Sequence, residues 1–178
     1  MKYLAVLFSI ITLIFFGFSS TGVNQVSGQL NKQNPAQNLM QSTTKFQAYL
    51  SGKEEVPPVK TKAQGEATFQ ISKDGNSIHY KLTVTNIDSV NMAHIHKGAS
   101  GADGPIVVWL YPSSPPAKLI LGKSNGVLAE GTITSANLTG PLAGKTIKDL
   151  INVMRSGNAY VNVHTKQNPA GEIRGQIK

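Results

Sequence analysis

Apolar residues at every second position restrict this chain to β structure from Lys45 onward more than any other feature does. Successive side chains of a strand point to opposite faces, so a period of two produces strands with one buried face. The pattern is clearest in three segments near the start of the domain: Phe46, Ala48 and Leu50; Ala67, Phe69 and Ile71; and Ile78, Tyr80, Leu82 and Val84. We therefore expect a domain built mainly of half-buried strands.

One segment departs from this period and predicts a helix over residues 147–154. Its apolar residues recur at spacings of three and four, which places them on one helical face. Thr146 with Asp149 resembles a capping box before the first turn, and Gly157 supplies a C-cap. The domain is therefore expected to carry a single amphipathic α-helix.

The remaining strand patterns complete the expected fold. The turn signal Asp74-Gly75-Asn76 predicts a hairpin between the second and third strands. Further strands are expected at residues 90–97, 106–110, 127–134, 159–165 and 171–178. Short antiparallel strands with one helix favour an all-β fold, an antiparallel Greek-key β-sandwich with one short crossing α-helix. A partly open barrel is the alternative.

The N-terminal residues indicate export. Lys2 precedes an apolar run over residues 4–18, which is shorter than the roughly 20 residues of a membrane span. We interpret residues 1–28 as a signal peptide cleaved between 19 and 28, with an uncleaved membrane anchor as the alternative. Residues 29–44, rich in Asn, Gln and Ser, read as a flexible polar linker to a domain over residues 45–178. The expected location is secreted or cell surface.

Composition limits the chemistry and the partners. The chain has no cysteine, which excludes disulfides and thiolate ligands and leaves imidazole, carboxylate, backbone and thioether groups for any metal. The formal charge of +8 is scattered along the chain. It favours an envelope or extracellular partner with an anionic surface, such as an envelope polymer or lipid head groups. Without a basic stripe or an aromatic platform, nucleic acid is not an expected partner.

Three of the four histidines occupy two strand segments in a pattern that suggests a metal site. His94 and His96 share one face of the strand at 90–97, while Ala93 and Ile95 share the other. His164 lies on the polar face of the strand at 159–165. The apolar faces are expected to point to the core, so these histidines point outward or into a cleft between strand and loop.

If the two strands are neighbours, His94, His96 and His164 can converge on one ion. Their ring nitrogens are then expected within roughly 4 to 5 Å of one another, because metal–nitrogen bonds are about 2 Å long. Imidazole ligands favour copper, with zinc as the alternative. His79, on the polar face of its own strand, is a candidate fourth ligand. In the competing structural interpretation, His94 and His96 bond to the backbone of the loop at 98–104, and His164 bonds to the turn that follows it.

Other polar residues carry weaker signals. Glu172 and Arg174 share a face of the last strand and are expected to pair with each other or to support His164 from behind. Glu54 and Glu55 precede two prolines, where solvated charge is expected. Asp103 reads as a turn residue. Asn137 begins a glycosylation sequon, which functions only in a host with the machinery.

Three stretches together resemble a known family. They are LSGKEEVPPVKTKAQGEATF, AHIHKGASGADGPIVVWL and GNAYVNVHTKQNPAGEIRGQI. In order and spacing they are similar to the CHRD domain, named after its repeats in chordin and found singly in many exported microbial proteins. The resemblance covers residues 45–178 and implies a β-rich extracellular domain whose molecular function is poorly defined.

The histidine pair with its glycine-rich loop is also loosely similar to copper–zinc superoxide dismutase, another Greek-key β domain. That enzyme uses six histidines and an aspartate for two metals, whereas this chain has four histidines. The resemblance therefore leaves only a mononuclear copper site, with Arg174 where a substrate-guiding arginine would sit.

These observations favour a non-enzymatic, exported CHRD-type binding module that recognises a partner or holds a metal ion through His94, His96 and His164. The first alternative is a mononuclear copper enzyme with dismutase-like chemistry. The second is a structural or adhesive envelope protein without metal.

Overall fold

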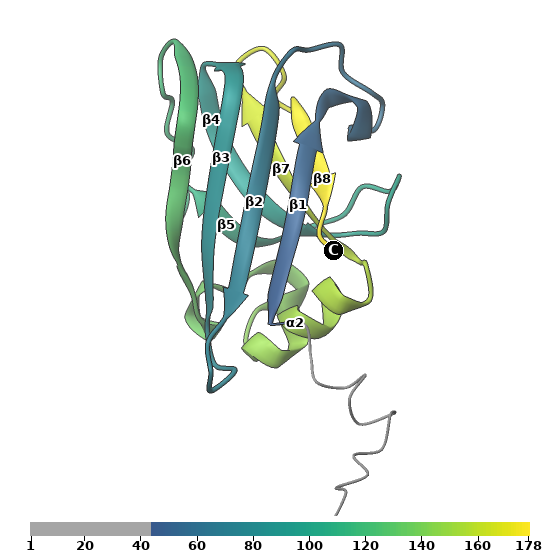
Figure 1. The fold of residues 1–178 in the computed structure, drawn as a ribbon, viewed down its shortest axis with the longest axis vertical. Helices are drawn as coiled ribbons and strands as arrows, with labels where there is room; N and C mark the ends of the chain where they lie inside the picture. Colours follow the sequence, from purple (N-terminus) through teal and green to yellow (C-terminus); the bar gives the residue numbers. More distant parts are fainter. Residues whose placement is uncertain (1–43) are drawn as a thin grey trace, which may run out of the picture. The chain divides into compact units, whose positions relative to one another are not determined.

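A computed structural model describes residues 44–178, and their strands form one continuous antiparallel sheet (Figure 1). The spatial order of the eight strands is β5-β4-β7-β8-β1-β2-β3-β6. Their bounds are β1 Lys45–Ser51, β2 Gln64–Ile71, β3 Ile78–Asp88, β4 Val90–Lys97, β5 Ile106–Tyr111, β6 Lys123–Ile133, β7 Ala159–Thr165 and β8 Ile173–Gln176. The predicted signal peptide, and the predicted linker except for Thr44, lie outside the described residues.

The sheet curls until its two ends approach each other. The hydroxyl of Tyr80 on β3 donates a hydrogen bond of 2.9 Å to the carbonyl of Leu110 on β5, and Leu138 forms a bridge to Val108. Strand β1 pairs with both β2 and β8, so no break divides the strands into two sheets. The predicted all-β class with one helix is confirmed, and the strands take the partly open barrel form of the two architectures expected.

The core lies inside this barrel, and α2 (Ile147–Arg155) lies across one open end (Figure 1). The helix buries the face predicted from its spacing: Ile147, Leu150, Ile151 and Met154. Its start is fixed by the predicted capping box, because the backbone N–H of Thr146 donates to Asp149 Oδ2 at 2.9 Å. Short 3₁₀ helices, η1 (Gly52–Glu54), η2 (Ser135–Asn137) and η3 (Gly140–Leu142), lie in the loops. No helix within residues 44–178 is long and apolar enough to span a membrane.

Two strands distant in sequence lie side by side and create the candidate site. Strand β4 pairs with β7, so that His94 lies opposite Asn162 and His96 opposite Tyr160. The apolar residues between them, such as Ile95 and Val163, are fully buried on the barrel side. The histidines therefore occupy the outer face of the sheet, where loops fold back over them.

Candidate metal centre

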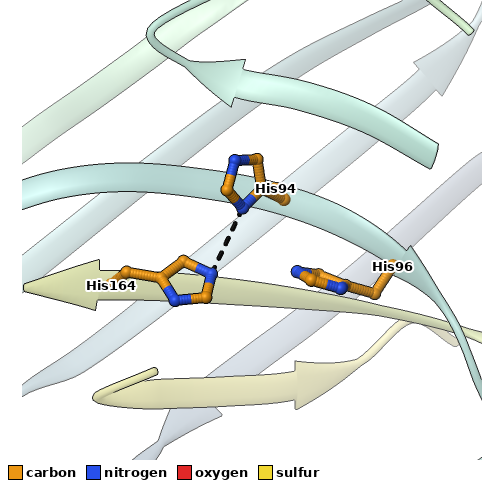
Figure 2. Close-up of side chains that lie close together, drawn as sticks. All are labelled: His94, His96 and His164. Carbon is orange, nitrogen blue, oxygen red and sulfur yellow. Dashed lines mark hydrogen bonds between the residues drawn. The ribbon is translucent and has the colours of Figure 1, made fainter. Parts of the chain in front are cut away.

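The three histidines singled out in the sequence meet on the outer face of β4 and β7 (Figure 2). One ring nitrogen from each of His94, His96 and His164 lies within 4.8 Å of the other two. This separation lies within the range expected from the sequence, and binding of one ion would draw the rings closer together, since metal–nitrogen bonds are about 2 Å long. Among the described residues, no carboxylate joins this group.

The cluster is buried and electrically neutral. His94 is 0 % exposed, His96 9 % and His164 7 %, so the rings are covered by loops and do not face open solvent. Burial, assisted by the neighbouring imidazoles, lowers the pKa of His94 from 6.5 to about 3. Burial likewise lowers the pKa of His164 to about 4 and shifts the pKa of His96 downward. All three rings are neutral at pH 7, the form that binds metals.

Two backbone carbonyls set the proton positions. His96 Nδ1 lies 2.9 Å from the carbonyl oxygen of Gly104, and His164 Nδ1 lies 3.0 Å from that of Pro169. A carbonyl only accepts, so each Nδ1 carries the proton and each Nε2 holds a lone pair. His94 Nδ1 is 3.2 Å from His164 Nε2 and donates to it in the metal-free protein.

The lone pairs of His96 Nε2 and His164 Nε2 are available to a metal, and His94 Nδ1 becomes the third ligand nitrogen once the His94 proton moves from Nδ1 to Nε2. Two ligands that each lie about 2 Å from a tetrahedral ion are separated by about 3.3 Å, close to the distance between His94 and His164. The carbonyl contacts of His96 and His164 are those of the structural interpretation. They are also the contacts that orient metal-bound histidines in proteins, so the two interpretations share this geometry.

Aromatic rings form the walls of the cluster. Trp109, the only tryptophan in the chain, lies nearly perpendicular to His94 with ring centres 4.2 Å apart. Tyr160 is stacked on His96, with ring centres 4.9 Å apart and planes 8° from parallel. The Tyr160 hydroxyl accepts a hydrogen bond from the Gly104 N–H at 3.1 Å. Tyr160 thereby supports both the His96 ring and the carbonyl group that orients it.

Arg174 supports the cluster indirectly, through its contact with Tyr160. Its guanidinium carbon lies 3.5 Å from the centre of the Tyr160 ring, on a side chain that is 2 % exposed. It donates to the carbonyls of Ala99 and Ala102 and pairs with Asp103 at 3.1 Å. The expectation that Arg174 supports His164 therefore needs correction, because its contacts hold Tyr160 and the loop beside His96.

Two other predicted residues lie apart from the cluster. Glu172 accepts from Thr61, Thr165 and Asn168 and so ties two loops together, with no hydrogen bond to His164. The structure does not bring His79 to the other histidines. On β3, His79 is exposed and its Nε2 lies 3.2 Å from Glu130 Oε1 on β6.

The sequence interpretation missed a buried carboxyl beside the site. Glu55 is only 6 % exposed and accepts a hydrogen bond of 3.1 Å from Asn162 Nδ2, whereas Glu54 is exposed as expected for both residues. Burial raises the pKa of Glu55 to about 7. Glu55 Oε1 and Asn162 Oδ1 both lie against Gly171, whose φ of +139° and close neighbours exclude a side chain. The two prolines after Glu55 indicated an exposed segment, and no pattern in the sequence predicts that this segment folds back over β7.

Comparison with known proteins places the chain in a family. The CHRD domain model matches residues 46–177. Chordin of Xenopus laevis is 30 % identical over 132 residues, which cover 72 % of this chain and 12 % of that protein. Chordin of Danio rerio is 30 % identical over 125 residues, which cover 68 % of this chain and 12 % of that protein. The chain thus spans about an eighth of these relatives, and no solved structure gives a significant match. This chain belongs to the CHRD domain family.

Proposed function

We propose that the domain is an exported binding module that holds one transition-metal ion, with copper preferred and zinc as the alternative. The observation that carries this proposal is the convergence of His94, His96 and His164 as neutral, buried rings within 4.8 Å of one another. Two of these rings are already oriented by backbone carbonyls. A site prepared in this way loses little entropy when a metal binds.

The unpaired Nε2 atom of His96 favours a metal over a purely structural role. The Nε2 atoms of His94 and His96 are buried without a hydrogen-bond partner in the described part of the chain. A buried polar atom without a partner costs about 1 to 3 kcal/mol. An apolar residue at either position would avoid this cost, whereas bound metal would use the lone pair of His96 directly.

The ligand set supports a single copper or zinc ion. Three imidazoles suit both metals, and affinity for nitrogen ligands is highest for copper. The fourth histidine, His79, lies at another part of the barrel. Among the described residues, no second group of three candidate ligands lies beside this one to hold a second ion.

Export and an anionic partner belong to the same proposal. The apolar run at residues 4–18 has the layout of a secretory signal, and the chain carries no cysteine that an oxidising compartment would pair. The charge of +8 favours an anionic envelope or extracellular surface over nucleic acid. Membrane attachment would arise only from an uncleaved signal anchor.

Metal titration of the purified, metal-free protein tests the site. Trp109 emission should be quenched by copper(II), because the Trp109 ring packs directly on His94. Mass spectrometry of the desalted protein should find one equivalent of copper or zinc. His94→Asn and His164→Asn should abolish binding, and His79→Asn is the matched control that should retain it. A wild-type protein that retains neither metal would overturn the proposal.

Two further readouts separate the alternatives. Superoxide removal by the copper-loaded protein, absent from His94→Asn, would assign dismutase-like catalysis in place of simple binding. Fractionation of producing cells tests export, since the proposal expects the mature domain in the medium or on the cell surface. Full-length protein confined to the cytoplasm would contradict the proposed location.

A further inference from the structure

A methionine shares the face of the sheet that carries the histidines. Met92 on β4 lies directly opposite His164 on β7, and His94 follows Met92 by two residues. Directly opposed residues of an antiparallel pair point to the same face, with Cβ atoms about 4.5 to 5.5 Å apart. Met92 therefore projects from the outer face, beside the cluster, and it is half-buried there.

Beside Met92, the neighbour of β4 changes from a strand to an irregular segment, in which the backbone N–H groups of Lys118 and Ile120 donate to the carbonyls of Asn91 and Val90. Strand β5 follows β4 only as far as the pair of Tyr111 with Ala93, so its paired segment stops short of Met92. A methionine side chain has three rotatable bonds and adapts to irregular space. A thioether is also one of the few ligand groups available to a chain that lacks cysteine.

We infer that the Met92 thioether is a fourth ligand of the centre formed by His94, His96 and His164, and that the completed site selects copper(I). This inference rests on the proposed metal-binding function. Soft thioether ligands favour copper(I) over zinc(II) and copper(II), while imidazoles accept all three. The sulfur therefore determines which ion the histidines hold.

The charges around the site favour the same ion. Three neutral imidazoles and a thioether supply no negative charge, and no carboxylate joins them among the described residues. Arg174, 1 % exposed, already places a cation behind Tyr160, and its partner Asp103 is 72 % exposed on its side chain. A buried charge without a counter-ion is costly, so a singly charged ion is accommodated more easily than a doubly charged one.

Affinity measurements under nitrogen test the inference. Copper(I) is supplied as its acetonitrile complex and competed with bathocuproine disulfonate, a chromophoric copper(I) chelator. Met92→Leu should weaken copper(I) binding by at least about tenfold, the smallest loss usual when a metal site is perturbed. Zinc(II) affinity should be unchanged. Met154→Leu, a similar exchange in the buried face of α2, is the matched control and should retain wild-type copper(I) affinity.

Methyl NMR provides a direct readout. With methionine labelled at its methyl carbon, diamagnetic copper(I) should shift the Met92 signal and leave the Met154 signal in place. If Met92→Leu binds copper(I) as tightly as wild type while His94→Asn does not, the thioether inference fails and the three-histidine centre stands. If the wild-type protein binds no metal, the proposed function fails, and the inference fails with it.

Discussion

The metal-free protein should lose stability steeply between pH 6.5 and pH 4.5. The folded state keeps His94 and His164 neutral down to pKa values of about 3 and about 4, whereas in the unfolded chain both take up protons near pH 6.5. Their stabilising effect is complete above pH 6.5 and is lost as the pH falls toward these folded-state values. Each of the two rings lowers the free energy of unfolding by about 1.4 kcal/mol per pH unit, so together they lower it by about 5 kcal/mol between pH 6.5 and pH 4.5.

Glu55 opposes part of this loss. Its pKa is about 7 in the fold and 4.5 when unfolded, so the folded state holds a proton that the unfolded chain releases. Glu55 therefore stabilises the fold fully below pH 4.5, and this effect is lost as the pH rises through 7. As the pH falls from 6.5 to 4.5, Glu55 thus restores about 2 kcal/mol of the free energy of unfolding. The net loss is about 3 kcal/mol, and the lowered pKa of His96 adds to it. Since a domain is typically stable by about 5 to 15 kcal/mol, this loss is readily measured.

Urea unfolding measures the effect, with Trp109 emission as the probe and a chelator present to exclude metal. Glu55→Gln should steepen the loss toward about 5 kcal/mol because it removes the opposing group. A free energy of unfolding that stays constant or rises from pH 6.5 to pH 4.5 would refute the idea that the cluster is buried in neutral form.

Two substitutions test how the loop at 98–104 supports the site. Gly104→Ala should weaken copper binding by about tenfold or more, because a Cβ there overlaps the carbonyl of Lys97 and displaces the loop. The control is a copper titration of Gly101→Ala, whose added Cβ meets no atoms and strains only the backbone. Equal copper affinities of the two variants would contradict this role of the loop. Arg174→Gln should release the carbonyls of the loop at 98–104, so amide hydrogen exchange should accelerate across this loop and stay unchanged in α2. Unchanged exchange in the loop would refute the idea that Arg174 supports it.

Local pattern predicted the strands that carry the site. Alternation in residues 90–97 and 159–165 correctly assigned His94, His96 and His164 to the faces opposite the core. The adjacency of β4 and β7 could only be assumed, because strands separated by some 60 residues meet through the path of the whole sheet. The burial of the histidines also escaped prediction, since it depends on loops that fold back over the sheet.

The supporting residues show the same limit. Arg174 and Glu55 are charged residues beside strands or prolines, and such residues are normally solvated. Their burial arises from partners far along the chain, Asp103 for Arg174 and Asn162 for Glu55. No periodicity within a segment encodes such pairings, so the sequence identifies the histidines of the cluster more readily than the groups that hold them in place.

The histidines lie on the outer face of the barrel, separated by the sheet from the apolar core. Because of this arrangement, the residues of the site can change in evolution without a change in the core residues that determine the fold. Substitutions at His94 or His164 leave the inner residues Ala93 and Val163 in place, so a copy of the domain can lose its histidine cluster and still fold. In proteins that carry several copies of this module, some copies can therefore evolve into plain scaffolds or acquire other polar residues on the same outer face.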